Sequence, residues 1–175
     1  WASAMAGNLE GLYAKNYKNL VTLSEENMIL CNGHNHGNIA HAFHGLFHAD
    51  DVTDEGECHR SKPVSKVKGY DFISKDERVI MQELFSRGPL AAGINANKLK
   101  YYRSGIINVD EKQCDPLNLT HVVLIVGYGE SYTGVPYWIV KNSWGTDWGE
   151  DGYFRIARGK GICGINRYVV TGIMG

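Results

Sequence analysis

Two polar residues have the types and the spacing of a catalytic pair. His121 stands at the head of one apolar run, and Asn142 follows the next apolar run and begins the segment NSWG at 142–145. An asparagine side-chain oxygen can accept the N–H of an imidazole and hold the ring in one tautomer. Such an imidazole acts as a general acid or base for a nucleophile, which predicts a partner thiol.

The pair, two nearby tryptophans and one glycine that are also candidates for a functional site all have a purely structural interpretation as well. A histidine before an apolar strand can be a buried histidine with satisfied hydrogen bonds, and Trp144 and Trp148 can be plain core aromatics. Gly37 can be a simple turn glycine. Residue types alone do not decide between the two interpretations.

Length and composition limit the class of protein. The chain has 175 residues, 43% of them hydrophobic, with a formal net charge of −1, which fits one large domain or two small lobes and predicts no nucleic-acid partner. The longest apolar run, Val122 to Val126, is too short to cross a bilayer, and no signal-peptide pattern is present. We therefore expect a soluble protein that binds no membrane. Because the chain begins with Trp1, we expect a processed product or a fragment.

Four cysteines and one sequon indicate an oxidising compartment. The cysteines lack the close Cys-x-x-Cys pairs of zinc sites, so we expect disulfides. The sequon Asn118-Leu119-Thr120 makes Asn118 a candidate glycosylation site. Both features favour secretion or a lysosome-like compartment. The cysteines are Cys31, Cys58, Cys114 and Cys163.

The first part of the chain has helical patterns. Apolar residues at helical spacing predict a buried helix that starts at or before Trp1, and Ser24 precedes a second helix over Glu25 to Cys31. A third helix is expected over Ile39 to His48. The segment 74–77, SKDE, has the pattern of a capping box, and its helix should end at the Gly88-Pro89 stop signal.

The second part consists of short β-type runs broken by glycine. Helices first and strands second predict the α+β class with two lobes packed together. The expected strands are Leu90 to Ile94, Ile106 to Val109, His121 to Tyr128, Tyr137 to Lys141, Tyr153 to Ala157 and Tyr168 to Thr171.

Five of the seven histidines lie within fifteen residues. Three of them share one face of the helix expected over 39–48, and stacked imidazoles can bind zinc or copper. No cysteine and no carboxylate stands among them, so we predict a solvated face rather than a metal site. The five are His34, His36, His41, His44 and His48.

Two long segments resemble the papain-like cysteine peptidases, the cathepsins. THVVLIVGYG (residues 120–129) is similar to the histidine block of that family, and YWIVKNSWGTDWGEDGYFRI (137–156) to its asparagine block. WASAMAGNLEG, LSEENMILCN and GICGIN match further family segments. The resemblance covers essentially the whole chain, and the cathepsin F-like and cathepsin L-like members are the most similar.

This resemblance implies a fold and a set of catalytic roles. It implies a single peptidase domain over 1–175, with a helical left lobe at about 1–63 and an antiparallel β-barrel-like right lobe at about 64–175. In the family, tryptophan directly follows the nucleophilic cysteine, so the position before Trp1 is implied for the nucleophile. His121 is then the imidazolium that supports a thiolate, Asn142 orients its ring, and Trp144 shields their hydrogen bond.

Substrate-binding positions and disulfides follow from the same resemblance. Gly37 matches the glycine loop whose backbone pairs with an extended substrate, and Leu119 and Val122 match the pocket for the substrate residue two before the cleaved bond. His34 stands where the family has a third-bridge cysteine. The implied pairs are Cys31 with Cys58 and Cys114 with Cys163.

Two hypotheses of function result. The first is a cysteine endopeptidase without cofactor or metal; because the nucleophile and the oxyanion-hole glutamine are both absent from these 175 residues, the chain alone should be inactive. The second is a papain-fold pseudoenzyme with a binding or structural role. The expected partners are a peptide or protein substrate and, further, a cystatin-like inhibitor or a propeptide, with the protein a monomer.

Overall fold

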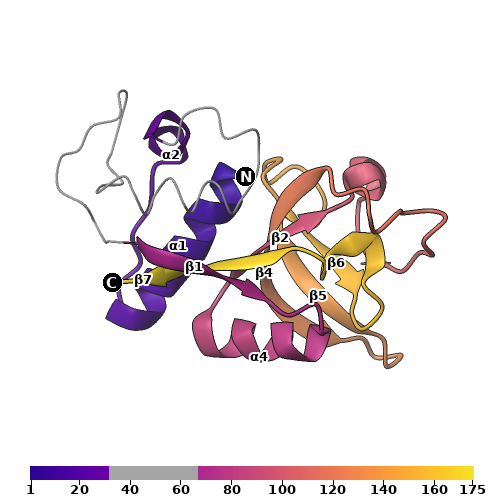
Figure 1. Cartoon of the computed structure of the whole chain (residues 1–175). Helices are drawn as coiled ribbons and strands as arrows, with labels where there is room; N and C mark the ends of the chain where they lie inside the picture. Colours follow the sequence, from indigo (N-terminus) through magenta and orange to yellow (C-terminus); the bar gives the residue numbers. More distant parts are fainter. Residues whose placement is uncertain (32–66) are drawn as a thin grey trace.

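The described helices and strands follow the order expected from the sequence, except for one strand over residues 67–73 that was not predicted. The computed structural model describes residues 1–31 and 67–175 (Figure 1). The histidine cluster, Gly37, Cys58 and the third expected helix lie outside these residues. The described helices are α1 (Ala2–Tyr17), α2 (Glu25–Cys31) and α4 (Glu77–Arg87), with 3₁₀ helices η1 (Ala96–Tyr101) and η2 (Ile162–Gly164).

Seven strands form one open sheet. Their order across the sheet is β1-β7-β2-β4-β5-β6-β3, and every pair is antiparallel except β3 with β6. The α+β class is as predicted, and the sheet is not closed into a barrel. The strands are β1 (Val67–Ile73), β2 (Leu90–Ile94), β3 (Ile106–Ile107), β4 (His121–Glu130), β5 (Pro136–Lys141), β6 (Tyr153–Ala157) and β7 (Val169–Met174).

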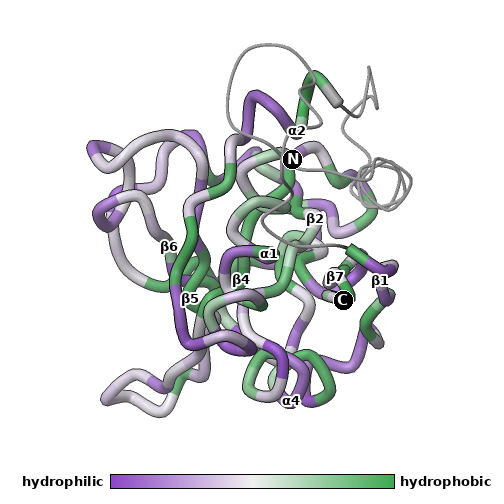
Figure 2. The backbone as a smooth tube through the Cα atoms, turned by 90° about the vertical axis from the view of Figure 1, so that its left-hand side faces the viewer, coloured by the Kyte–Doolittle hydropathy of each residue, from purple (hydrophilic) through white to green (hydrophobic). Residues whose placement is uncertain are grey.

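The central strands separate two hydrophobic clusters. Ala91 packs in the cluster of α1 and α2, whereas its neighbour Ala92 packs in the cluster that includes α4, β5 and β6. Val170 and Val169 of β7 divide in the same way, because successive side chains of a strand point to opposite faces. Strand β2 is accordingly buried at every residue, and hydrophobic stretches, in green, occur in the strands around β4 (Figure 2). Helices α1 and α4 therefore cover opposite faces of the same strands.

Helix α1 lies unusually close to the sheet. A Cβ atom at Gly7 would lie 2.5 Å from Leu124 Cδ2, and one at Gly11 would lie 2.5 Å from Pro89 Cδ. Between them, the fully buried Asn8 donates from Nδ2 to the Pro89 carbonyl (2.6 Å) and to Thr171 Oγ1 (3.0 Å). Two glycines one helical turn apart, together with the hydrogen bonds of Asn8, thus set the distance between α1 and the sheet.

The start of α4 differs from the capping box expected at residues 74–77. Asp76, not Ser74, is the N-cap, and its carboxylate accepts the Arg78 backbone N–H at 2.9 Å. Glu77 does not cap the helix, because its carboxylate is buried and accepts the Trp138 indole N–H (2.7 Å) and the Gly161 backbone N–H (2.6 Å). The buried indole N–H of Trp138, in a distant strand, thus binds the Glu77 carboxylate that the capping-box pattern assigned to the start of the helix.

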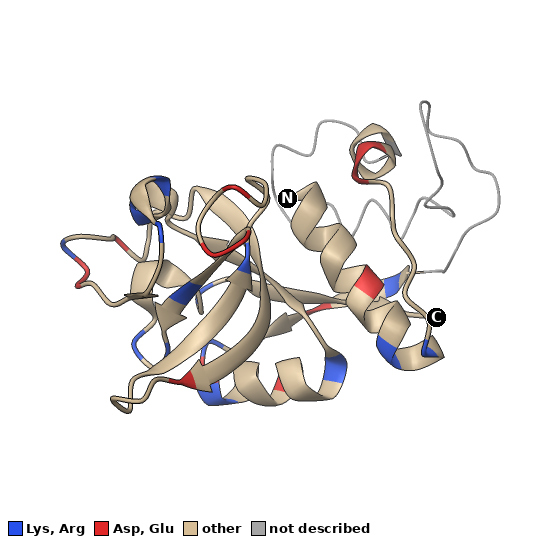
Figure 3. Ribbon diagram, turned by 180° about the vertical axis from the view of Figure 1, so that it is seen from behind, with Lys and Arg blue, Asp and Glu red and all other residues tan. Residues whose placement is uncertain are grey.

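Charged residues of both signs are scattered over the elements drawn in Figure 3. Lys and Arg alternate with Asp and Glu over the loops and helix ends in the view of Figure 3, in line with the net charge of −1. None of the helices in the described ranges is long and apolar enough to cross a membrane.

Candidate active site

His121 and Asn142 meet at one end of the sheet. His121 is the first residue of β4, and Asn142 follows the last residue of β5. Because these strands are antiparallel neighbours, the start of one lies beside the end of the other. His121 Nε2 lies 2.8 Å from Asn142 Oδ1.

A backbone contact fixes which way the Asn142 amide points. The Ser143 N–H donates to Asn142 Oδ1 at 2.8 Å, so this atom is the carbonyl oxygen and not the amide nitrogen. His121 must then donate from Nε2, which in a neutral imidazole leaves Nδ1 as the base. Asn142 is only 6% exposed, so bulk water competes little for these bonds. No side-chain motif in the sequence indicates the contribution of Ser143.

A row of aromatic rings in contact with one another lies beside the pair. The Trp144 ring centroid lies 5.1 Å from that of His121, and Trp148 meets Trp144 edge-on at 5.2 Å. Tyr102 continues the stack, 5.6 Å from Trp148, and the Trp148 indole N–H donates to the Leu99 carbonyl at 3.2 Å. Trp148 is thus a core aromatic and also a support for Trp144, and Tyr102 is a member of the stack that sequence reasoning did not find.

Burial dominates the electrostatics of His121. Loss of hydration lowers the pKa of its imidazole below the usual 6.5, and the bond to Asn142 opposes this shift in part. The first turn of α1 lies beside this pair, since Ser3 and Ala4 line the same small pocket as Asn142.

The two residues matched to the substrate pocket lie on either side of His121. Leu119 is half-buried, and a Cβ at Gly93 would lie 3.1 Å from its Cδ1. Val122 is also half-buried and pairs with Gly93 across β2 and β4. Because Gly93 has no side chain, Leu119 and Val122 both have space beside His121.

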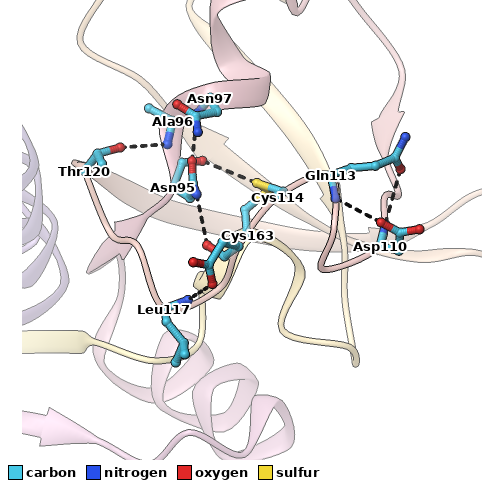
Figure 4. Close-up of a disulfide and its surroundings, with 10 residues drawn as sticks. Asn95, Ala96, Asn97, Asp110, Gln113, Cys114, Leu117, Thr120 and Cys163 are labelled. Atoms are coloured by element: carbon cyan, nitrogen blue, oxygen red, sulfur yellow. Dashed lines mark hydrogen bonds between the residues drawn. A yellow bond between two sulfur atoms is a disulfide. The ribbon is translucent and has the colours of Figure 1, made fainter.

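One of the two implied disulfides lies within the described residues. Cys114 and Cys163 are bonded across 49 residues and are both 2% exposed (Figure 4). Beside the bridge, Asn95 donates from its amide to the Asp115 carbonyl at 2.9 Å. Asn118 is exposed, as a glycosylation site requires. The pairing of Cys31 with Cys58 lies outside the described residues.

No metal cluster is found where the structure can be searched. Within residues 1–31 and 67–175, no three histidine, cysteine or acidic side chains are grouped as metal ligands. His121 and Asn142 have each other as partners, with aromatic rings beside them, so their surroundings suit proton transfer.

Comparison with known proteins places this geometry in a family. Residues 1–173 match the papain family cysteine proteases. The chain is 35% identical to cathepsin F of Drosophila melanogaster over 99% of its own length and 32% of the relative's. It is 40% identical to the viral cathepsin of Adoxophyes honmai nucleopolyhedrovirus over 98% of its length and 54% of the relative's. The chain thus spans between a third and about half of these relatives.

Solved structures have the same fold. Digestive procathepsin L 3 from the larval midgut of Tenebrio molitor superposes with a TM-score of 0.88 at 31% identity, over 98% of this chain and 62% of that one. Bromelain from Ananas comosus, solved in complex with the E64 inhibitor, gives 0.88 at 30% identity, over 100% and 88%. The protein therefore belongs to the papain family of cysteine proteases.

Proposed function

We propose that the protein is a cysteine endopeptidase in which His121 is the proton-transfer group and Asn142 orients it. The observation that carries this proposal is the 2.8 Å contact between His121 Nε2 and Asn142 Oδ1, with the amide orientation fixed by Ser143. This arrangement commits Nε2 to donation and leaves Nδ1 for the reacting groups. Membership of the papain family supports the same chemistry.

The nucleophile belongs, in this proposal, at the position before Trp1. Cys114 and Cys163 are bonded to each other, so neither can attack a substrate. A residue before Trp1 would lie at the N-terminus of α1, where the helix dipole favours a thiolate. The first turn of α1 supports this position, because Ser3 and Ala4 lie beside Asn142. The segment Trp1–Gly175 alone is then inactive.

The reaction follows from these positions. The thiolate sulfur attacks the carbonyl carbon of the peptide bond, and the carbonyl electron pair moves to the oxygen. When the tetrahedral intermediate collapses, the C–N bond breaks and His121 Nδ1–H gives its proton to the leaving amine, which leaves a thioester. His121, now neutral, takes a proton from water as that water attacks the thioester. Release of the carboxylic acid restores the thiolate and the imidazolium.

Binding of the substrate uses the two sides of His121. Leu119 and Val122 supply an apolar wall for the residue two before the cleaved bond, and Gly37 pairs by its backbone with the extended substrate. A propeptide and cystatin-like inhibitors would occupy the same cleft of a monomer; the Tenebrio structure is a procathepsin. Glycosylation of Asn118 and function in a lysosome-like or extracellular compartment complete the proposal.

The test uses the native protein, including the residues that precede Trp1. A thiol-directed epoxide should label that protein at the residue before Trp1, and an unstructured peptide should be cleaved internally. His121→Ala should abolish cleavage, whereas His59→Ala, a histidine that the proposal does not use, should retain it. A residue other than cysteine before Trp1, or no cleavage by a folded native protein, would instead establish the pseudoenzyme.

A further inference from the structure

A small pocket lies directly beside Asn142. It is enclosed by the first turn of α1, by β4 and by the end of β5, and its volume is about 10 Å³. That is close to the smallest space that holds one water molecule. The two residues of α1 that line it, Ser3 and Ala4, have small side chains. The other lining residues are Val122, Val123, Leu124, Lys141, Asn142 and Ser143.

Asn142 brings an unsatisfied donor to this pocket. Its Oδ1 accepts from His121 and Ser143, but its Nδ2 is buried and has no hydrogen-bond partner among the described residues. A buried donor without an acceptor destabilises the folded protein, and such groups are rare in native proteins. The amide cannot turn over to avoid this cost, because Ser143 and His121 both require its oxygen where it is.

Ser3 supplies the second polar group. This residue is half-buried and lines the same pocket, and within the described part of the chain its hydroxyl makes no hydrogen bond. A hydroxyl can both donate and accept. A ligand that accepts from Nδ2 and also bonds a hydroxyl, within the volume of one small molecule, has the chemistry of water.

We propose that one ordered water binds in this pocket, accepts a hydrogen bond from Asn142 Nδ2 and forms another with the Ser3 hydroxyl. Ser3 is thereby a positioning residue, since it holds Asn142 and acts on His121 only through it. The water also joins the first turn of α1 to the end of β5. Its effect on catalysis rests on the endopeptidase function proposed above, whereas its presence does not.

Thr and Val at position 3 provide a matched pair, because they have nearly the same shape and differ in one hydroxyl. Crystal structures of the native protein and of Ser3→Thr should each contain a water about 3 Å from Asn142 Nδ2 and from the hydroxyl at position 3. In Ser3→Val this water should be lost or weakly occupied. An empty pocket in the native protein, or an unchanged water in Ser3→Val, overturns the proposal.

Kinetics test the positioning role separately. Ser3→Val should lower kcat for peptide cleavage by about tenfold, the equivalent of one hydrogen bond, with KM unchanged, and Ser3→Thr should retain the native kcat. If Ser3→Val does not fold, Ser3→Ala takes its place. Equal kcat values for the hydroxyl and non-hydroxyl variants reject the role of Ser3. A native protein that cleaves nothing rejects the proposed function, and the crystallographic result still decides whether the water binds.

Discussion

At the scale of single residues, the geometry of the site depends on which hydrogen bonds each polar atom makes. Asn142 Oδ1 accepts two hydrogen bonds, one from the backbone of Ser143 and one from His121. The backbone bond decides the orientation of the amide, and the amide decides the tautomer of the imidazole. Trp144 lies against the ring but is 39% exposed, so it covers one side of His121 and leaves water access elsewhere.

Burial should make His121 a weaker base than free histidine. In a variant whose proposed nucleophile is replaced by alanine, so that no thiolate opposes the effect, NMR titration should give a pKa below 6.5, because desolvation disfavours the imidazolium. The unfolded chain then binds the proton more readily than the folded protein. The neutral, buried His121 therefore contributes its full stabilisation to the folded protein above pH 6.5. This contribution falls as the pH drops from 6.5 toward the lowered pKa.

Comparison with His121→Gln isolates that contribution from the other six histidines. The difference in unfolding free energy between the two proteins, measured in urea, should change with pH only in the window below 6.5. A difference that is constant with pH, or a pKa of 6.5 or higher, contradicts the assignment of burial as the dominant cause.

At the scale of elements, buried polar side chains join segments that are distant in sequence. Glu77, in the first turn of α4, accepts from Trp138 in β5 and from the backbone of Gly161 before η2. Asn8 does the same between α1, the residue that precedes β2, and β7, where its Oδ1 accepts the Gly172 N–H at 2.9 Å. Hydrogen bonds are directional, so these contacts fix the orientation of each helix against the sheet in addition to the apolar packing.

Replacement of Glu77 by alanine should lower the free energy of unfolding by about 3 kcal/mol, because the buried Trp138 indole N–H and the half-buried Gly161 N–H lose their acceptor. Glu77→Gln keeps one oxygen acceptor and should lose less. Chemical denaturation followed by Trp fluorescence measures both. Glu111→Ala, at an exposed position, is the control and should stay within about 0.5 kcal/mol of the native protein. A loss from Glu77→Ala as small as that of the control would show that these bonds contribute little.

At the scale of the whole molecule, the site lies where α1 meets the sheet. His121 begins β4 and Asn142 follows β5, whereas Trp1 precedes α1 and Ser3 lies in its first turn. One apolar cluster packs α1 against the sheet. The distance between α1 and the sheet therefore sets the geometry between the proposed nucleophile and its base. An error of about 1 Å in such a distance can cost a hundredfold in rate.

Gly11→Ala tests this dependence. Alanine would stabilise an exposed helix by about 1 kcal/mol relative to glycine, but here its Cβ would lie 2.5 Å from the Pro89 ring. Overlap of this kind costs about 1–3 kcal/mol, so we expect net destabilisation together with a fall in kcat. Addition of Pro89→Ala removes the ring and should restore both quantities in part. A single variant as stable and as active as the native protein would contradict the close approach.

The sequence by itself determined the α+β class, the bounds of β2 and β6 and the end of α4, and it predicted His121 and Asn142 as the catalytic pair. Apolar periodicity, stop signals and long family segments are local, so one sequence suffices to find them. Strand β1 was missed because Val67–Ile73 includes glycine and charged residues, and its pairing with β7 decides its state. Only the tertiary structure decided the cap at Asp76, the inward position of Glu77, the role of Ser143 and the pocket beside Ser3. Each of these depends on a donor, an acceptor or a space supplied by a distant segment or by the folded backbone, and side-chain types along the chain do not specify where that partner lies.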